Sequence, residues 1–187
     1  MITTTLLSAL IVTVLGYLAV CALLAQRFTL ARRLHVQRAK GERVVRFPAR
    51  DGRARIEAHF VPGEGGDGRA VVLVHGKDAC RGHELKGDST RLVAALSARG
   101  IAVLAIDLRG HGRSSRARLT YGERERFDVL GAVDWLREQG HDRIGVLGAS
   151  MGAATALLAA ADEPAIVALV ADSPFADFGR MIERQYR

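Results

Sequence analysis

Cysteine is scarce in this sequence, whose 187 residues include only Cys21 and Cys80. Cys21 lies within a long apolar run and Cys80 in the polar remainder of the chain. The two side chains could not approach each other closely enough for a disulfide. We therefore predict no intrachain bridge, which agrees with a reducing compartment. The chain also has no internal repeat and no low-complexity tract, so nothing interrupts its pattern of elements.

Charge is absent from the first part of the chain. No Asp, Glu, Lys or Arg occurs from Ile2 to Gln26, where Leu, Ile, Val and Ala dominate. A helix needs about 20 such residues to cross the hydrocarbon core of a bilayer. A cleaved signal peptide is the alternative, but those carry basic residues before the apolar segment, and none precedes this one. We expect residues 1–26 to be a retained transmembrane anchor.

Basic residues are concentrated directly after this run. Between Arg27 and Arg55 there are ten basic and two acidic residues. We expect residues 27–42 to be a basic linker at the membrane surface, with anionic lipid near Arg27, Arg32 and Arg33. The positive-inside rule then places the rest of this single-pass protein in the cytoplasm. Because aromatic residues do not alternate with the basic ones and no binding motif occurs, we expect no nucleic-acid partner.

From residue 43 onward, predicted strands alternate with predicted helices. Two alternating segments predict a β-hairpin, continuous apolar runs predict buried strands, and wider apolar spacing predicts helices. One helix is expected to begin at Thr120, with Glu123 completing a capping box. The predicted strands are Arg43–Phe47, Arg55–Val61, Ala70–Val74, Ile101–Ile106, Ile144–Leu147 and Ile166–Ala171. This order is typical of an α/β fold with a mostly parallel sheet and helices on both faces.

A serine motif lies between a predicted buried strand and a predicted helix. The chain reads Gly148-Ala149-Ser150-Met151-Gly152, the Gly-x-Ser-x-Gly pattern of a nucleophile elbow. In such an elbow the serine hydroxyl projects from the strand end, and the glycines avoid collisions between strand and helix. We predict that Ser150 is the catalytic nucleophile and that the backbone N–H of Met151 is one oxyanion donor.

A second motif, His75-Gly76-Lys77, follows the predicted strand Ala70–Val74. The loop after this strand supplies the other oxyanion donor in such an architecture, and Gly76 lets the backbone approach substrate. We predict that this donor is the backbone N–H of Lys77.

Together these motifs resemble the α/β-hydrolase superfamily from about Val44 onward. The resemblance rests on Val-His-Gly (74–76), Asp-Leu-Arg-Gly-His-Gly-Arg-Ser (107–114), the serine motif and Asp-Ser-Pro-Phe (172–175). The last, with Tyr-Gly-Glu (121–123), is most similar to the Bem46-like membrane-anchored serine hydrolases. The resemblance implies hydrolysis of a small-molecule ester, thioester or amide without a cofactor. A metal site is not expected, because the spacing of His75, Asp78, Cys80, His83 and Glu84 matches no standard zinc pattern.

No histidine follows Ser150, since all six histidines precede it. The superfamily places its acid and then its histidine after the serine. We therefore expect residues 43–187 to be the N-terminal two-thirds of a truncated hydrolase domain, ending at an exposed apolar strand. We also expect little turnover by this chain alone. Asp172, at a strand end, is a candidate acid, although a polar strand terminus explains it as well.

Two other classes of function stay open. Without a base, the chain would be an inactive, membrane-anchored binding or vestigial protein. A nucleotide-binding domain is the second, because Gly145-x-x-Gly148-x-x-x-Gly152 partly copies a dinucleotide unit. Leu147, however, stands where that pattern needs a glycine.

Overall fold

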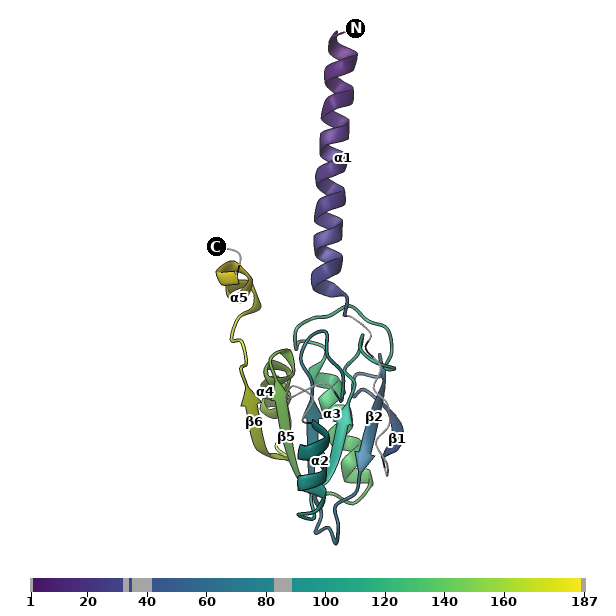
Figure 1. Ribbon diagram of the computed structural model, residues 1–187, viewed down its shortest axis with the longest axis vertical. Helices are drawn as coiled ribbons and strands as arrows, with labels where there is room; N and C mark the ends of the chain where they lie inside the picture. Colours follow the sequence, from purple (N-terminus) through teal and green to yellow (C-terminus); the bar gives the residue numbers. More distant parts are fainter. Residues whose placement is uncertain (1, 32–33, 35–41, 83–88, 186–187) are drawn as a thin grey trace.

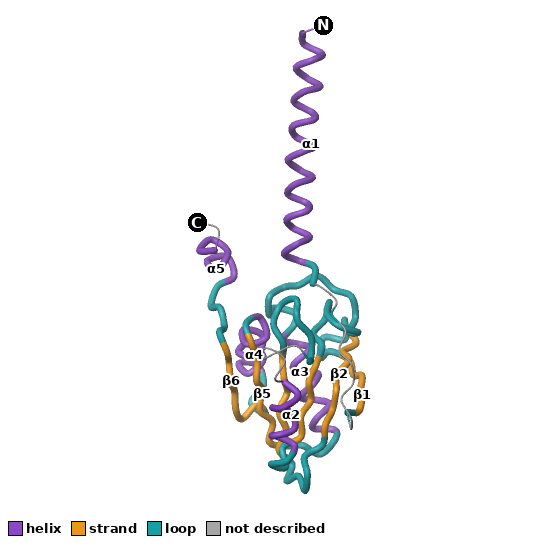
Figure 2. The backbone as a smooth tube through the Cα atoms, in the orientation of Figure 1, coloured by secondary structure: helices purple, strands orange, loops and turns teal. Residues whose placement is uncertain are grey.

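A mixed sheet of six strands in the order β1-β2-β4-β3-β5-β6 forms the centre of the computed structural model. The structure describes residues 2–31, 34, 42–82 and 89–185 (Figures 1 and 2). The elements are α1 (Ile2–Thr29), β1 (Arg43–Pro48), β2 (Arg55–Val61), β3 (Arg69–Val74), α2 (Ser89–Ser97), β4 (Ala102–Ile106), α3 (Arg126–Glu138), β5 (Arg143–Ala149), α4 (Met151–Asp162), β6 (Ile166–Asp172) and α5 (Phe178–Gln185).

The strand directions confirm the predicted α/β sheet. β1 and β2 form an antiparallel hairpin, and β2 also runs antiparallel to β4. β3 is parallel to both β4 and β5, and β5 is parallel to β6. The carboxyl ends of these four parallel strands therefore lie at one edge of the sheet, which is where α/β folds bind ligands.

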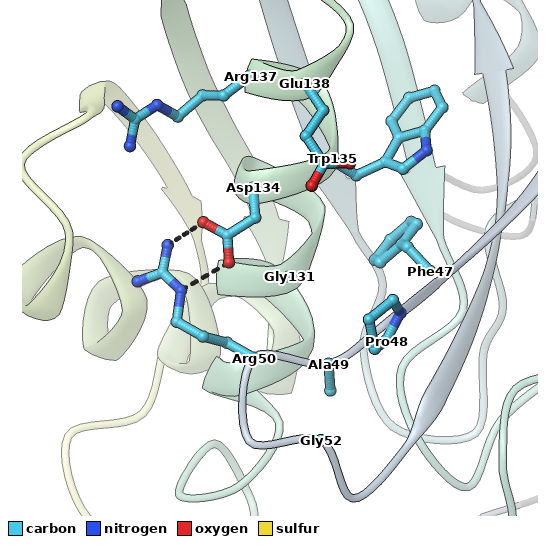
Figure 3. Close-up of a pocket in the computed structure, with 10 residues that line it drawn as sticks. All are labelled: Phe47, Pro48, Ala49, Arg50, Gly52, Gly131, Asp134, Trp135, Arg137 and Glu138. Carbon is cyan, nitrogen blue, oxygen red and sulfur yellow. Dashed lines mark hydrogen bonds and ion pairs between the residues drawn. The ribbon is translucent and has the colours of Figure 1, made fainter.

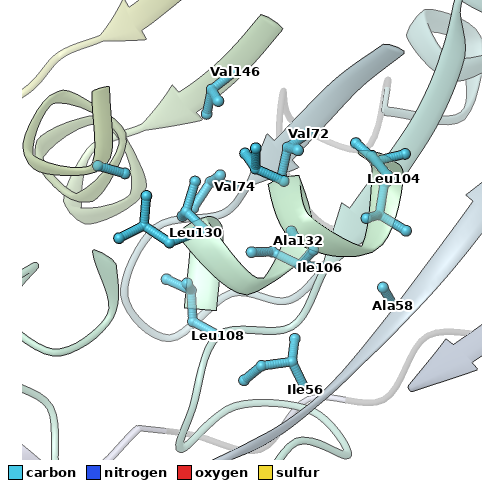
Figure 4. Packing of buried hydrophobic residues seen from close by; sticks show 14 of the residues in the cluster. Ile56, Ala58, Val72, Val74, Leu104, Ile106, Leu108, Leu130, Ala132 and Val146 are labelled. Atoms are coloured by element: carbon cyan, nitrogen blue, oxygen red, sulfur yellow. The ribbon is translucent and has the colours of Figure 1, made fainter. Parts of the chain in front are cut away.

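Helices cover both faces of the sheet. α3 and α4 pack on one face and against each other, whereas α2 packs on β4 from the other face. The larger core lies under α3 and α4, where Val72, Leu104, Ile106 and Val146 meet Leu130 and Ala132 (Figure 4). In α3 four apolar residues are fully buried: Val129, Ala132, Val133 and Leu136. Their burial follows from the i, i+3, i+4, i+7 spacing of one helix face.

The predicted start of α3 was wrong. The helix begins at Arg126, and residues 121–125 form turns. The side chain of Glu125, and not that of Glu123, bonds back to this segment. Its carboxylate accepts from the N–H and hydroxyl of Thr120 and from the N–H of Gly122, at 2.7–2.8 Å. A buried carboxylate that satisfies three donors stabilises the turn, and the helix starts only after it.

Helix α1 stands away from the sheet as a single rod (Figure 1). Its segment from Ser8 to Thr29 is apolar and is not buried by the described protein. The hydroxyls of Thr13 and Thr29 donate to the carbonyls of Ala9 and Ala25, so they are satisfied within the helix. The length and composition suit either a membrane anchor or a signal sequence. Arg32 and Arg33 of the predicted basic linker lie outside the described residues.

Strand β6 occupies one edge of the sheet. Val167 and Val170 on this strand are 64% and 57% exposed, and Leu157 and Leu158 of the neighbouring α4 are also exposed. An apolar strand at this edge was expected from the sequence. Unpaired N–H and C=O groups beside exposed valines favour pairing with other chains.

Candidate active site

Ser150 lies at the turn from β5 to α4, in the conformation that a nucleophile elbow requires. Its φ is 51° and its ψ is −115°, which is a strained conformation for a residue with a side chain. The N–H of Ser150 donates to the carbonyl of Asp172 at 2.8 Å, so the end of β6 holds the turn. The residue is exposed. The hydroxyl is therefore accessible to a substrate.

The elbow needs glycine on both sides of Ser150. A Cβ at Gly148 would lie 2.4 Å from the carbonyl oxygen of Gly152. A Cβ at Gly152 would lie 2.3 Å from the carbonyl oxygen of Val74 at the end of β3. Both distances are far below van der Waals contact, and in both cases the obstacle is backbone. The two glycines allow β3, β5 and α4 to pass this closely.

A pocket of about 260 Å³ opens onto Ser150. It brings together the three residues predicted for acyl transfer, Ser150, Met151 and Lys77. Met151 begins α4, so its backbone N–H is among those that the helix leaves without an internal acceptor. The rest of the lining is Arg27, Phe28, Tyr121, Phe175, Phe178, Met181 and Ile182. Arg27 and Phe28 belong to the last turns of α1, which the sequence analysis had not linked to the site.

His75 is an unsuitable base for Ser150. The side chain is buried, with Nδ1 against the carbonyl oxygen of Gly76 at 2.8 Å and Nε2 accepting from the N–H of Leu108 at 3.1 Å. Burial, His111 and Arg81 lower the pKa of His75 to about 3. His111 is also buried, and its ring packs edge-on against that of His75, with centroids 4.6 Å apart. Both rings therefore order the loops at the sheet edge.

Acidification is expected to destabilise the domain through His75. In the unfolded chain this imidazole takes up a proton below its ordinary pKa of 6.5, whereas in the folded protein it stays neutral until about pH 3. The unfolded state thus binds more protons at this residue, and His75 alone lowers the free energy of unfolding by about 2 kcal/mol from pH 6.5 to 4.5. Urea unfolding in detergent, followed by the fluorescence of Trp135, would measure this. His75→Gln should lack this contribution, so its stability should fall by about 2 kcal/mol less than that of the wild type over the same range, and an identical pH dependence of the two proteins would contradict the explanation.

The Asp172 carboxylate accepts from the hydroxyl of Ser173 at 2.9 Å and does not line the Ser150 pocket. His83 and Glu84 lie outside the described residues. Among the residues that the structure does describe, no group of His, Cys, Asp or Glu could hold a metal.

Another pocket lies away from Ser150. It has a volume of about 750 Å³ and lies between the β1–β2 hairpin and α3 (Figure 3). The guanidinium of Arg50 donates to both carboxylate oxygens of Asp134 there, at 2.6 and 2.8 Å. None of the residues predicted for acyl transfer lines this pocket.

Sequence reasoning missed the buried ion pairs that support the loop after β4. The backbone N–H and Nε of Arg109 donate to Asp128 at 2.8 and 2.9 Å, and its Nη atoms bond Asp51 at 3.0 and 3.1 Å. Arg81 likewise joins Glu57 and Asp107. Arg109 and Asp107 occur in the quoted motif Asp-Leu-Arg-Gly-His-Gly, but nothing in the sequence identifies their distant partners.

Comparison with known proteins places this geometry in a family. A family model described as serine aminopeptidase, S33, matches residues 67–185. No curated protein matches the chain. An esterase of Pyrococcus furiosus superposes with a TM-score of 0.74 at 26% identity, over 84% of this chain and 63% of that one. A dienelactone hydrolase of Anabaena variabilis gives 0.57 at 25% identity, over 68% and 61%.

A further solved structure supports the fold alone. Est1E of Butyrivibrio proteoclasticus, bound to ferulic acid, has a TM-score of 0.57 at 23% identity, over 74% of this chain and 56% of that one. The chain spans 57–63% of the length of the Pyrococcus furiosus esterase chains. From the family match and these neighbours, the chain belongs to the α/β-hydrolase superfamily, in the family described as serine aminopeptidase, S33.

Proposed function

We propose that this chain carries the nucleophile and oxyanion hole of a membrane-anchored serine hydrolase that acts on small-molecule acyl esters. The observation that carries the proposal is the strained, exposed Ser150 at the start of α4, in one pocket with Lys77 and Met151. The esterase neighbours favour an ester as substrate over a thioester or amide. Within the superfamily, the sequence motifs favour the Bem46-like branch.

The chemistry follows from the positions of these groups. The Ser150 oxygen bonds to the acyl carbon, and the carbonyl oxygen takes up the negative charge. The backbone N–H groups of Met151 and Lys77 are proposed to bind this oxyanion. The hydroxyl proton goes to a base, the ester C–O bond breaks, and the alcohol leaves with a proton. Water then hydrolyses the acyl-serine by the same route.

A proton acceptor must therefore reach Ser150, and no histidine lines the described part of its pocket. This observation also favours the alternative of an inactive binding protein. Free imidazole can replace an absent base, and general-base catalysis contributes about 10²–10⁴-fold to rate. Added imidazole therefore distinguishes a serine hydrolase from an inactive binding protein.

Covalent labelling with a fluorophosphonate, followed by intact-mass measurement, tests the proposal. We expect one phosphonyl group on Ser150, added at least about tenfold faster when imidazole is present. Ser150→Ala should give no adduct under the same conditions. Labelling that persists in Ser150→Ala, or no labelling of the wild type even with imidazole, would overturn the proposal and favour a binding role.

A further inference from the structure

The end of α1 is fixed against the active-site pocket. The Tyr121 hydroxyl donates to the carbonyl of Phe28, and the N–H of Leu119 donates to the carbonyl of Thr29 at 2.8 Å. Ala31 packs against the core cluster of the domain. Arg27 and Phe28 line the pocket that contains Ser150. The end of the apolar helix is therefore held at the pocket that contains Ser150.

The membrane surface is expected at the same height as this pocket. Arg27 is the first charged residue of the chain, and the residues from Ile2 to Gln26 are uncharged. A helix that spans a bilayer places its first flanking arginine at the interface, where the guanidinium reaches the headgroups. Because Arg27 itself lines the pocket, the opening to Ser150 lies next to the lipid.

The wall of the pocket is suited to an acyl chain. Phe178, Met181 and Ile182 recur at i, i+3 and i+4 on α5, so one face of that helix is turned to the cavity. The ring of Phe178 stacks on that of Tyr121 with centroids 3.5 Å apart, and Phe175 packs beside them. Aromatic rings and flexible methionine side chains accommodate hydrocarbon of variable shape.

We infer that the substrate is a long-chain acyl ester that resides in the bilayer and reaches Ser150 from the membrane surface, past the last turn of α1. This inference rests on the proposed hydrolase function and names its substrate class. Ser150 takes the acyl group as described above, and water releases a fatty acid that can return to the lipid. A water-soluble ester would use the catalytic groups but not the apolar wall.

The test uses the full chain in phosphatidylcholine vesicles with imidazole and two probes, ethyl fluorophosphonate and hexadecyl fluorophosphonate. The labelling rate of Ser150 is measured by intact mass. We expect the hexadecyl probe to react at least about tenfold faster, because burial of each methylene in the pocket is favourable. Phe28→Ala should reduce the ratio of hexadecyl to ethyl labelling at least about fivefold. Leu24→Ala, one turn earlier on α1 and outside the pocket, should leave the ratio unchanged.

The outcomes separate the hydrolase function of Ser150 from the entry of substrate past α1. If neither probe labels Ser150, the proposed hydrolase function fails. If both label it at similar rates, or if Leu24→Ala changes the ratio as much as Phe28→Ala does, Ser150 is a nucleophile but substrate does not enter past α1. Simple partitioning of the hexadecyl probe into vesicles would raise the labelling ratio equally in the wild type, Phe28→Ala and Leu24→Ala. A difference between the two variants therefore cannot come from partitioning.

Discussion

Replacing Gly152 by alanine is expected to lower the free energy of unfolding by about 3 kcal/mol or more and to abolish labelling of Ser150. The new Cβ would lie 2.3 Å from the carbonyl oxygen of Val74 and 2.5 Å from that of His75. Both obstacles are backbone atoms of the central strand β3 and its end, so no side-chain rotation relieves the collision. Helix α4 would have to move away from β3, and Ser150 would move with it.

Urea unfolding followed by Trp135 fluorescence would measure the loss of stability, since Trp135 is the only tryptophan of the chain and packs on Phe47 and Phe60. Gly145→Ala is the matched control. Its Cβ would meet only ordinary contacts at 3.6 Å, on the same strand that leads to the elbow. We expect this variant to stay within about 1 kcal/mol of wild type. Equal effects at Gly145 and Gly152 would refute the close-approach explanation.

The positions of the strands and of the turn at Ser150 could be predicted because the relevant patterns are local. A buried strand such as β3 or β4 is a continuous apolar run, and the inward face of α3 repeats every three or four residues. The elbow combines a strand, five residues and a helix in one stretch of chain. The structure brings Ser150, Met151 and Lys77 into one pocket, as the motifs had suggested.

Two features of the structure could not be predicted from such patterns. The start of α3 at Arg126 depends on Glu125, whose bonds to Thr120 and Gly122 outcompete a capping box. The contact between Phe28 and Tyr121 joins residues 93 positions apart. A pairing across that distance arises from tertiary packing, and no periodicity in the sequence encodes it. The role of α1 in the pocket was missed for this reason.

Replacing Asp128 by alanine is expected to lower the free energy of unfolding nearly as much as Gly152→Ala does. Asp128 is fully buried and holds the buried Arg109, whose Nη2 lies 2.7 Å from its Oδ1. In Asp128→Ala the guanidinium would keep only Asp51, at the turn between β1 and β2. A buried charge that loses its main partner destabilises a protein by about 3–5 kcal/mol. The loop after β4 would also lose the bond that fixes its backbone N–H to α3.

Asp134→Ala provides the comparison on the same helix. Asp134 also pairs with an arginine, Arg50, but both side chains are partly exposed to solvent. We expect its removal to cost less than about 1 kcal/mol, because water compensates the loss. Urea unfolding of the two variants side by side measures the contrast.

The double variant Arg109→Met/Asp128→Leu distinguishes an unpaired charge from lost packing. Replacing both members of a buried ion pair by apolar side chains is often neutral or even stabilising. We therefore expect the double variant to be more stable than Asp128→Ala, although Asp51 then loses a partner at the surface of the domain. The double variant could instead be the least stable of the three proteins. The ion pair of Arg109 and Asp128 would then itself stabilise the fold, and the destabilisation in Asp128→Ala would not come from an unpaired arginine.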